Sequence, residues 1–410
     1  MNRRQAVNNG GEGDLDMSGA DGAAMPENKR ERPKLLIAAT IPATISAFLI
    51  PYADHFRGLG WRVDAMARGA AKSEPLEGHF DSLIDAEWSR NPLDLNNIAK
   101  NNRRIRELSA ARGYDIVHVH TPVASFVTRL ALRKLRLSGR PKVVYTAHGF
   151  HFCRGGRRAS NFIFRTLEKM AGHWTDKLIV INREDFEAAK KYRVADPESL
   201  TYMPGIGLDF SAYGRREKKN SDTLKIRAEL GLGDDDILYS MIAEFNPGKR
   251  HKDAIIALSK TGEDKIHLAC AGDGRLLLET KDLAQSLGVE KRVHFLGRIA
   301  DPRPLLEASR ATIMPSEREG LSRALMESAC LGVPIIGSDA RGVYDIVHDH
   351  RGLLFPVGDQ LALRDAMLQM AAERYPSITP DPNWRIENLI HMHEELYEEL
   401  LKNMAGDGER

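Results

Sequence analysis

The stretch that decides the fold is Glu319-Gly320-Leu321-Ser322-Arg323-Ala324-Leu325-Met326-Glu327. It follows the apolar run Thr312-Ile313-Met314, which predicts a buried strand, and precedes Gly332-Val333-Pro334, which is typical of a helix end. We therefore predict a helix from about Ser322 to Cys330. The backbone amides of Gly320 to Arg323 would lie at its N-terminus, where the helix dipole favours a phosphate.

Two carboxylates lie eight positions apart in this stretch. Glu319, at the strand end, can accept hydrogen bonds from sugar hydroxyls, and Glu327, inside the predicted helix, can accept from both hydroxyls of a ribose. The alternative is an ordinary surface glutamate followed by an ordinary helix glutamate. The flanking strand and the Gly-Leu turn favour the first interpretation.

Short apolar runs alternate with longer amphipathic stretches over the rest of the chain. The runs of the first half are Leu35–Ile37, Ile116–Val119, Val143–Tyr145 and Leu178–Ile181. Those of the second half are Ile237–Ile242, Leu268–Cys270, Val293–Leu296, Thr312–Met314 and Ile335–Ile336. Strands that alternate with helices form parallel sheets covered on both faces. We predict the α/β class, with two doubly wound domains that face a cleft beyond the carboxyl ends of their strands.

The chain has 410 residues, which is enough for two domains. We predict domains at 33–207 and 223–380, joined by a polar linker at 208–222. Residues 1–32 are polar and rich in Gly and Asn, so we expect a disordered extension there. The tail, 381–410, has the apolar spacing of a helix.

The overall charge is nearly balanced, because 59 Lys and Arg face 57 Asp and Glu for a formal net charge of +2. A nucleic-acid binder would usually be more basic, so we expect no nucleic-acid partner. Cys153, Cys270 and Cys330 lack the spacing of metal ligands and indicate a reducing, cytoplasmic location. No run of about 18 apolar residues occurs, so we expect no transmembrane helix.

These segments together resemble the E-x7-E region of retaining glycosyltransferases with the GT-B architecture, the "glycosyl transferases group 1" family. The resemblance covers nearly everything from Lys34 to Leu401. It implies two Rossmann-like domains facing a cleft, with a C-terminal helix packing back on the N-terminal domain. It also implies that Glu319 contacts the donor sugar and Glu327 the nucleotide ribose.

A second segment, from Met241 to Asp253, resembles the family's clamp for the donor diphosphate. The family usually has an arginine and a lysine there. Lys249 matches the lysine, but Glu244, five residues earlier, occupies the arginine position. A subgroup with Gly-Glu-Leu and Lys-Asn-His resembles this sequence more closely, and Arg250 is a candidate for the missing positive charge. The alternative for Lys249 is a solvated loop lysine.

Other stretches resemble further parts of the family's donor site. Phe295 to Ile299 is similar to the segment whose backbone reads the base, often uracil. Ser338 to Val343 is similar to the loop that closes the nucleotide site, although a plain strand–helix turn is the alternative. The residues implied in donor binding, besides the two carboxylates and Lys249, are Arg250, Arg298, Gly320, Leu321 and Ser322.

In the first domain, His148 follows a predicted strand, and the resemblance implies that it faces the reacting sugar. The alternative is a buried structural histidine, and the same two interpretations stay open for His120. The first loop, from Thr40 to Ser46, lacks the Gly pair often found in the family. Thr44 and Ser46 are candidate donors to the acceptor there.

A basic band with interleaved apolar residues runs through the first domain, from Phe126 to Arg165. It is either a solvated helix face or a surface for anionic lipid or a lipid-diphosphate acceptor. The stretch around His151 and the arginines after it, which include Arg154 and Arg157, resembles polysaccharide-assembly members that extend undecaprenyl-diphosphate-linked sugars. We therefore expect an acceptor that is lipid-linked or an oligosaccharide, and peripheral contact with the inner face of the plasma membrane.

The expected reaction is retaining transfer of a hexose or N-acetylhexosamine from a nucleotide sugar, UDP-linked, to a growing surface glycan. His148, Lys249 and Glu319 are the predicted catalytic residues. No Asp-x-Asp segment follows a predicted strand, so we expect no metal and no other cofactor. Two alternatives stay open: a GT-B sugar-nucleotide epimerase, and a non-catalytic GT-B assembly module, which Glu244 and the Gly-poor first loop would fit.

Overall fold

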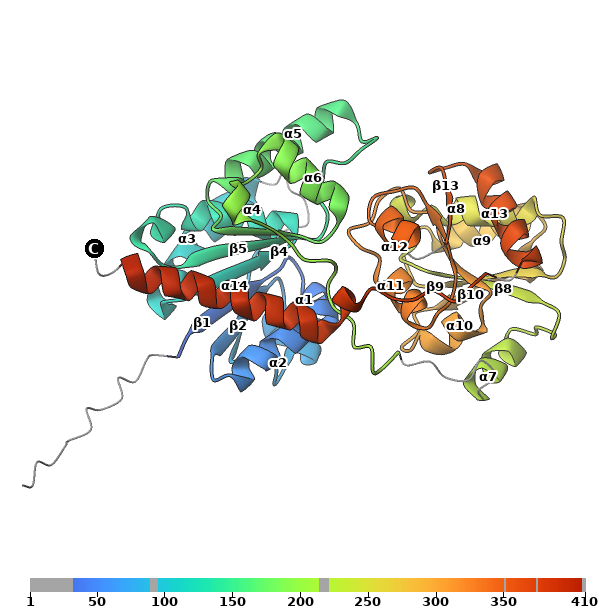
Figure 1. The fold of residues 1–410 in the computed structure, drawn as a ribbon, viewed down its shortest axis with the longest axis horizontal. Helices are drawn as coiled ribbons and strands as arrows, with labels where there is room; N and C mark the ends of the chain where they lie inside the picture. The colour runs from blue at the N-terminus through green and yellow to red at the C-terminus, as the bar shows by residue number, and fades with distance from the viewer. Residues whose placement is uncertain (1–31, 89–94, 214–220, 350–351, 374, 408–410) are drawn as a thin grey trace, which may run out of the picture. The chain divides into compact units, whose positions relative to one another are not determined.

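A computed structural model describes residues 32–88, 95–213, 221–349, 352–373 and 375–407. Residues 1–31 of the predicted disordered extension and residues 214–220 of the predicted linker lie outside the described residues. The described chain contains two parallel sheets flanked by helices (Figure 1). The predicted α/β class with two Rossmann-like domains is therefore confirmed.

The first sheet has the strand order β3-β2-β1-β4-β5-β6-β7, and all neighbouring strands are parallel. Its strands are β1 Lys34–Ala38, β2 Arg62–Ala67, β3 Ser82–Asp85, β4 Ile116–His120, β5 Lys142–Ala147, β6 Lys177–Val180 and β7 Leu200–Tyr202. The α-helices of this domain are α1 Pro42–Phe48, α2 Ile50–Gly58, α3 Leu95–Arg112, α4 Pro122–Leu132, α5 Arg158–Gly172 and α6 Arg183–Tyr192.

The second sheet has the order β10-β9-β8-β11-β12-β13 and is also parallel throughout. Its strands are β8 Ile237–Ile242, β9 Ile266–Ala271, β10 Val293–Gly297, β11 Ala311–Met314, β12 Ile335–Ser338 and β13 Leu353–Phe355. The α-helices that follow the first domain are α7 Ser221–Glu229, α8 His251–Ser259, α9 Leu277–Ser286, α10 Arg303–Ala308, α11 Arg323–Cys330, α12 Val343–Asp349, α13 Gln360–Ala372 and α14 Ile386–Asp407.

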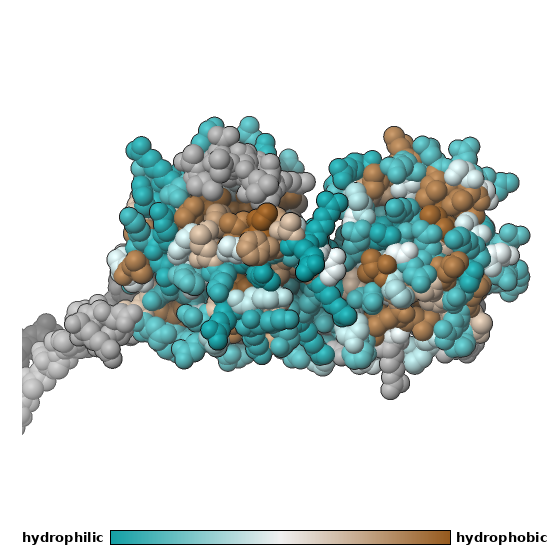
Figure 2. Space-filling view, turned by 90° about the horizontal axis from the view of Figure 1, so that it is seen from above, coloured by the Kyte–Doolittle hydropathy of each residue, from teal (hydrophilic) through white to brown (hydrophobic). Residues whose placement is uncertain are grey.

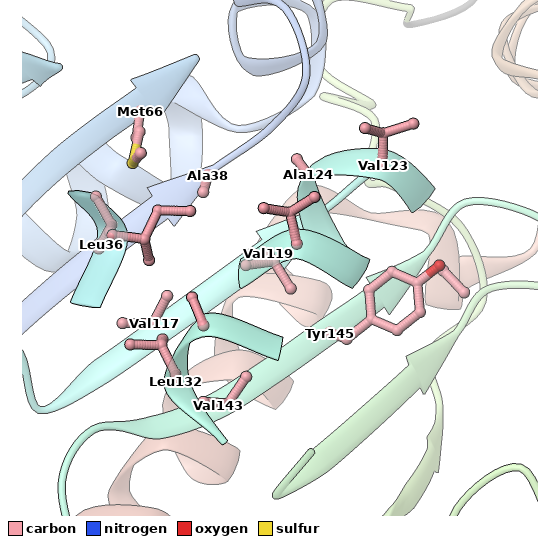
Figure 3. Packing of buried hydrophobic residues seen from close by; sticks show 14 of the residues in the cluster. Leu36, Ala38, Met66, Val117, Val119, Val123, Ala124, Leu132, Val143 and Tyr145 are labelled. Atoms are coloured by element: carbon pink, nitrogen blue, oxygen red, sulfur yellow. The ribbon is translucent and has the colours of Figure 1, made fainter. Parts of the chain in front are cut away.

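The strands of the first sheet are buried on both faces. Successive residues of a strand point to opposite faces, and in β1 Leu36 belongs to one apolar cluster whereas Leu35 and Ile37 belong to another. Figure 3 shows the first of these clusters, which also contains Val117 and Tyr145 of the neighbouring strands β4 and β5. This two-sided burial is why the apolar runs are continuous and do not alternate with polar residues.

The C-terminal helix α14 packs on the first domain and not on the second sheet that precedes it. Leu389, Leu396 and Tyr397 share a buried cluster with Leu35 and Phe56 of the first domain. In Figure 1, α14 runs alongside the first sheet near α1 and α2. The implied return of the C-terminal helix to the N-terminal domain is therefore confirmed.

One local prediction in the first domain is wrong. The segment Thr40 to Ser46 was expected to be a loop, but α1 begins at Pro42. Proline is favoured in the first turn of a helix, because its fixed φ suits the helix and its missing N–H would have no partner there. The carboxyl end of β1 is therefore followed by a helix start, and Thr44 lies within α1.

Candidate active site

The predicted site residues cluster at one edge of each sheet. In each sheet the strand order reverses at one point, between β1 and β4 in the first and between β8 and β11 in the second. Open α/β sheets bind ligands beyond the carboxyl ends of strands at such a point. His120 ends β4 and His148 directly follows β5, whereas Lys249 and Glu319 follow β8 and β11.

Lys249 and Glu319 are in direct contact. The Nζ atom of Lys249 lies 2.6 Å from Oε1 of Glu319, although the two residues are 70 positions apart. The side chains are 25% and 11% exposed, so the pair is partly shielded from water. The structure thus brings together the two residues predicted to hold the donor diphosphate and the donor sugar. Each neutralises the other.

The predicted helix after Glu319 is confirmed as α11, Arg323–Cys330, with Ser322 as its N-cap residue. The Ser322 side chain makes no capping hydrogen bond. The N-terminus of α11 therefore offers backbone N–H groups beside the Lys249–Glu319 pair, as a phosphate site requires.

Glu327 is buried in the second turn of α11 and is held in place by two donors. Tyr213 donates its hydroxyl proton to Oε1 of Glu327 at 2.7 Å, and Nε of Arg323 donates to the same oxygen at 2.8 Å. Burial, followed by the nearby Glu327 carboxylate, raises the pKa of Tyr213 above its usual value. The hydroxyl therefore stays a donor at neutral pH, and Glu327 stays oriented. Tyr213 was missed by the sequence reasoning, because it lies 114 positions from Glu327.

The remaining charged residues of the predicted donor site are paired with other side chains of the second domain. Arg250 donates through Nε to Asp253, and its Nη1 lies 3.0 Å from Glu317. Arg298 is 85% exposed and lies 3.9 Å from Asp273. Glu244, the residue in the usual arginine position, is exposed and accepts a hydrogen bond from Asn246 at 3.2 Å. A diphosphate would therefore compete with carboxylates for Arg250 as well as for Lys249.

His148 belongs to a line of imidazoles that extends into the first domain. Its Nε2 lies 3.0 Å from Nδ1 of His120, whose ring centroid lies 4.2 Å from that of His118, with the two rings tilted by 34°. The His118 ring in turn lies 5.6 Å from that of His393 on α14. Burial lowers the pKa of His148 to about 4, with the nearby His393 as a smaller cause, so the ring is neutral near pH 7.

The hydrogen bond between His120 and His148 fixes which nitrogen carries each proton. The Nε2 atom of His120 is buried and has no hydrogen-bond partner among the described residues. A buried acceptor without a partner is less costly than a buried N–H without one. We infer that His120 donates from Nδ1 to Nε2 of His148, which leaves Nδ1–H of His148 as its free donor.

The predicted acceptor residues lie on α1 and around α5 of the first domain. Thr44 is half-buried in α1, Arg154 is exposed, and Arg157 is the N-cap residue of α5. On α5, Phe162 is 61% exposed and Ile163 is 49% exposed. Figure 2 views the molecule from the side on which Figure 1 draws α5, and apolar and hydrophilic atoms lie side by side on this domain. Among the described helices, none is long and apolar enough to cross a membrane.

Contact between the first and second domains places His148 beside Glu319. A Cβ atom on Gly320 would overlap the backbone carbonyl of His148, so the two backbones touch. A neutral imidazole, an ammonium–carboxylate pair and a helix N-terminus meet where two Rossmann-like domains face each other. Two Rossmann-like domains arranged in this way define the GT-B architecture.

Comparison with known proteins identifies the family. The family model "Glycosyl transferases group 1" matches residues 222–379, and the model "Glycosyltransferase Family 4" matches residues 47–204. The putative glycosyltransferase EpsD of Bacillus subtilis is 33% identical over 82% of this chain and 87% of its own length. The chain therefore belongs to the glycosyl transferases group 1 family, and it is a glycosyltransferase.

Two further comparisons extend this result. The UDP-Gal:alpha-D-GlcNAc-diphosphoundecaprenol alpha-1,3-galactosyltransferase of Escherichia coli is 27% identical over 75% of this chain and 80% of its own. The solved structure of sucrose-phosphate synthase from Thermosynechococcus elongatus covers 91% of this chain and 100% of its own, with a TM-score of 0.74 and 18% identity. The latter likeness concerns the fold alone.

Proposed function

We propose that this protein is a retaining glycosyltransferase that moves a hexose or N-acetylhexosamine from a UDP-sugar to a lipid-diphosphate-linked glycan in surface polysaccharide biosynthesis. The observation that carries this proposal is the contact of 2.6 Å between Lys249 and Glu319 at the N-terminus of α11. Along the segment from Glu319 to Glu327, a carboxylate suited to a sugar is followed by backbone amides suited to a diphosphate and then by a carboxylate suited to a ribose. The contact brings Lys249 to the first of these groups.

In the proposed reaction, the acceptor hydroxyl oxygen forms a bond to C1 of the donor sugar on the face from which the diphosphate leaves. The bond from C1 to the diphosphate oxygen breaks, and the hydroxyl proton passes to a leaving phosphate oxygen. Charge develops on that phosphate, so fixed donors beside it supply most of the rate enhancement. We propose this role for Lys249 and the amides before α11. We propose that neither a metal ion nor a covalent nucleophile takes part.

Neutral His148 would donate from Nδ1 to a hydroxyl of the transferred sugar. Glu319 would accept from a second hydroxyl once the diphosphate has taken its place beside Lys249. A donor and an acceptor on opposite sides of the sugar fix its orientation, which is the precondition for attack from the leaving-group face.

The lipid-linked acceptor is supported by two observations. The curated relative from Escherichia coli is named for a diphosphoundecaprenol substrate and a UDP-sugar donor. In this chain, Phe162 and Ile163 are exposed on α5, next to the arginines at 154, 157, 158 and 165. Apolar side chains beside cationic ones suit an anionic lipid surface. We propose that the acceptor is reached at the cytoplasmic face of the membrane.

The test combines purified protein, candidate UDP-sugars and a synthetic undecaprenyl-diphosphate-linked sugar, with and without EDTA. Glycosylated lipid that forms equally well in EDTA and is lost in Lys249→Ala is the expected outcome. An altered sugar nucleotide in the absence of any acceptor would instead indicate an epimerase. UDP binding with no turnover on any acceptor would indicate a non-catalytic module.

A further inference from the structure

Arg341 is a buried cation that links the two domains. It lies in the loop between β12 and α12, and its side chain is only 4% exposed. The partners of its two Nη atoms are nonetheless in the first domain: Nη1 lies 2.8 Å from Asp185 and donates to the carbonyl of Phe152 at 3.1 Å, and Nη2 donates to the carbonyl of Phe150 at 3.0 Å. A buried charge is tolerated only when it is paired and hydrogen-bonded in this way.

The same side chain also holds the loop that carries Glu319. The Nε atom of Arg341 donates to the backbone carbonyl of Glu319 at 3.2 Å. The backbone carbonyl of Arg341 accepts from the backbone N–H of Glu319 at 3.0 Å. Both backbone polar groups of Glu319 are therefore bound to Arg341, whose guanidinium also binds the segment just after His148.

Glycines allow these backbones to come together. Gly149 has a φ of 121°, and a Cβ on it would lie 3.0 Å from Nη2 of Arg341. Gly342 has a φ of 74°, and a Cβ on it would overlap the carbonyl of Gly320. We call the contact of Arg341 and Gly342 with residues 149–152 on one side and with Glu319 and Gly320 on the other the interdomain joint. This joint has no room for a side chain at Gly149 and Gly342. A small displacement of either loop therefore breaks several contacts at once.

Asp185 makes the first-domain side of the joint rigid. It accepts from Nδ2 of Asn182 at 2.8 Å and from the backbone N–H of Phe150 at 3.1 Å, in addition to its ion pair with Arg341. One carboxylate thus orients both the guanidinium and the segment that follows His148.

We propose that Arg341 is a positioning residue that fixes Glu319 and His148 relative to each other across the domain boundary. It acts through the backbone of Glu319 and through the segment 150–152, and does not itself touch the substrate. This role rests on the proposed transfer reaction, in which Glu319 and His148 hold opposite sides of one sugar. Misplacement of such groups by about 1 Å costs on the order of 100-fold in rate.

The first test is Arg341→Ala, with Arg364→Ala as the control, since Arg364 pairs with Asp365 within α13 of the same domain. We expect kcat for transfer to fall on the order of 100-fold in Arg341→Ala only. UDP binding should fall far less than kcat, because the side chain of Arg341 binds the backbone of Glu319 and the first domain and makes no contact with Lys249 or Glu327. Millimolar guanidinium restores part of kcat in Arg341→Ala. A merely structural residue would lose UDP binding and kcat together, and that result overturns the proposal.

The second test opens the joint without removing the cation. Gly320→Ala places a methyl group against the carbonyl of His148, whereas in the control Gly233→Ala the nearest contact of the added Cβ is an ordinary 3.5 Å. We expect Gly320→Ala to lose kcat as Arg341→Ala does. Wild-type kcat in both variants contradicts the proposed role.

A third measurement does not depend on activity. Spin labels at Glu198→Cys and Glu290→Cys, one in each domain, report the interdomain distance in a background of Cys153→Ser and Cys330→Ser. Arg341→Ala should broaden that distance distribution. An unchanged distribution would refute the claim that Arg341 fixes the two domains relative to each other. If the wild type glycosylates no acceptor, the proposed function fails while this measurement still decides on Arg341.

Discussion

Replacing Glu319 by Gln should change UDP binding and sugar transfer in opposite directions. The Glu319 carboxylate forms an ion pair with the Lys249 ammonium group at 2.6 Å. A diphosphate must therefore displace this carboxylate before it can bind the ammonium group. Glu319→Gln removes that competitor and its negative charge, but keeps the shape of the side chain. Lys249→Ala removes the cation itself.

The expected magnitude follows from the exposure of the pair. Ion pairs that water still reaches contribute up to about 1 kcal/mol, and Lys249 is 25% exposed. Losing the competing pair should therefore tighten UDP binding about fivefold. The carboxylate's hydrogen bond to the sugar is worth about 1.5–3 kcal/mol, so transfer should fall on the order of 10- to 100-fold. Lys249→Ala should weaken UDP binding and lower kcat on the order of 100- to 1000-fold.

The assay is calorimetric titration with UDP beside initial transfer rates, at low and high salt. Glu229→Gln serves as the control, because Glu229 also pairs with a lysine, Lys225, but does so on the exposed surface of α7. Weaker UDP binding in Glu319→Gln would refute the competition between the carboxylate and the diphosphate. Unchanged binding and transfer in Lys249→Ala would refute the site as a whole.

Three further predictions concern residues that support the site. Burial lowers the pKa of His148 and His393 to about 4, so the unfolded chain binds more protons than the folded one between about pH 4 and 6.5. The melting temperature should therefore fall as the pH drops through this window, and less steeply in His393→Phe; an equally steep fall in the variant would contradict the assignment to His393. His120→Asn can still donate to His148 and should keep most of kcat, whereas His120→Phe should lose about tenfold; equal rates would show that the tautomer does not matter. Tyr213→Phe removes one of two donors to Glu327 and should raise the KM for the UDP-sugar less than about tenfold without changing kcat, and a change in kcat alone would contradict a role in ribose binding.

Local signals in the sequence predicted the strands that bear the site, and non-local pairing explains what they missed. The apolar runs at β8, β11 and β12 each lie on a strand of the structure, and a proline directly follows β11 and directly precedes β12. By contrast, β2 contains Asp64, which is fully buried and would not be expected inside a strand. Its carboxylate is satisfied by Arg112 at 2.6 Å and by Tyr114 at 2.7 Å, some 50 residues away.

The same distinction applies to the site. Glu319, Glu327 and Lys249 lie in local motifs, so their proposed roles could be predicted one by one. The ion pair between Lys249 and Glu319 could not be predicted, because no local pattern records a contact across 70 positions. Arg250 is a similar case: its contact with Glu317, 67 positions away, is recorded by no local pattern, and its role at the diphosphate stays a prediction.

The unusual Glu244 is less of an obstacle to diphosphate binding than the sequence alone indicates, because the nearby cations are themselves paired with carboxylates. Lys249 is neutralised by Glu319, and Arg250 by Asp253 and Glu317, so the free site is not a strongly cationic pocket awaiting an anion. Glu244 itself is exposed, where water and salt screen its charge. An incoming diphosphate must then gain from the amides at the start of α11 and from exchange with Glu319, and not from a surplus of cations. Because the displaced carboxylate is the group proposed to hold the sugar, binding of the diphosphate and capture of the sugar become one event, and a second cation at position 244 is not required for it.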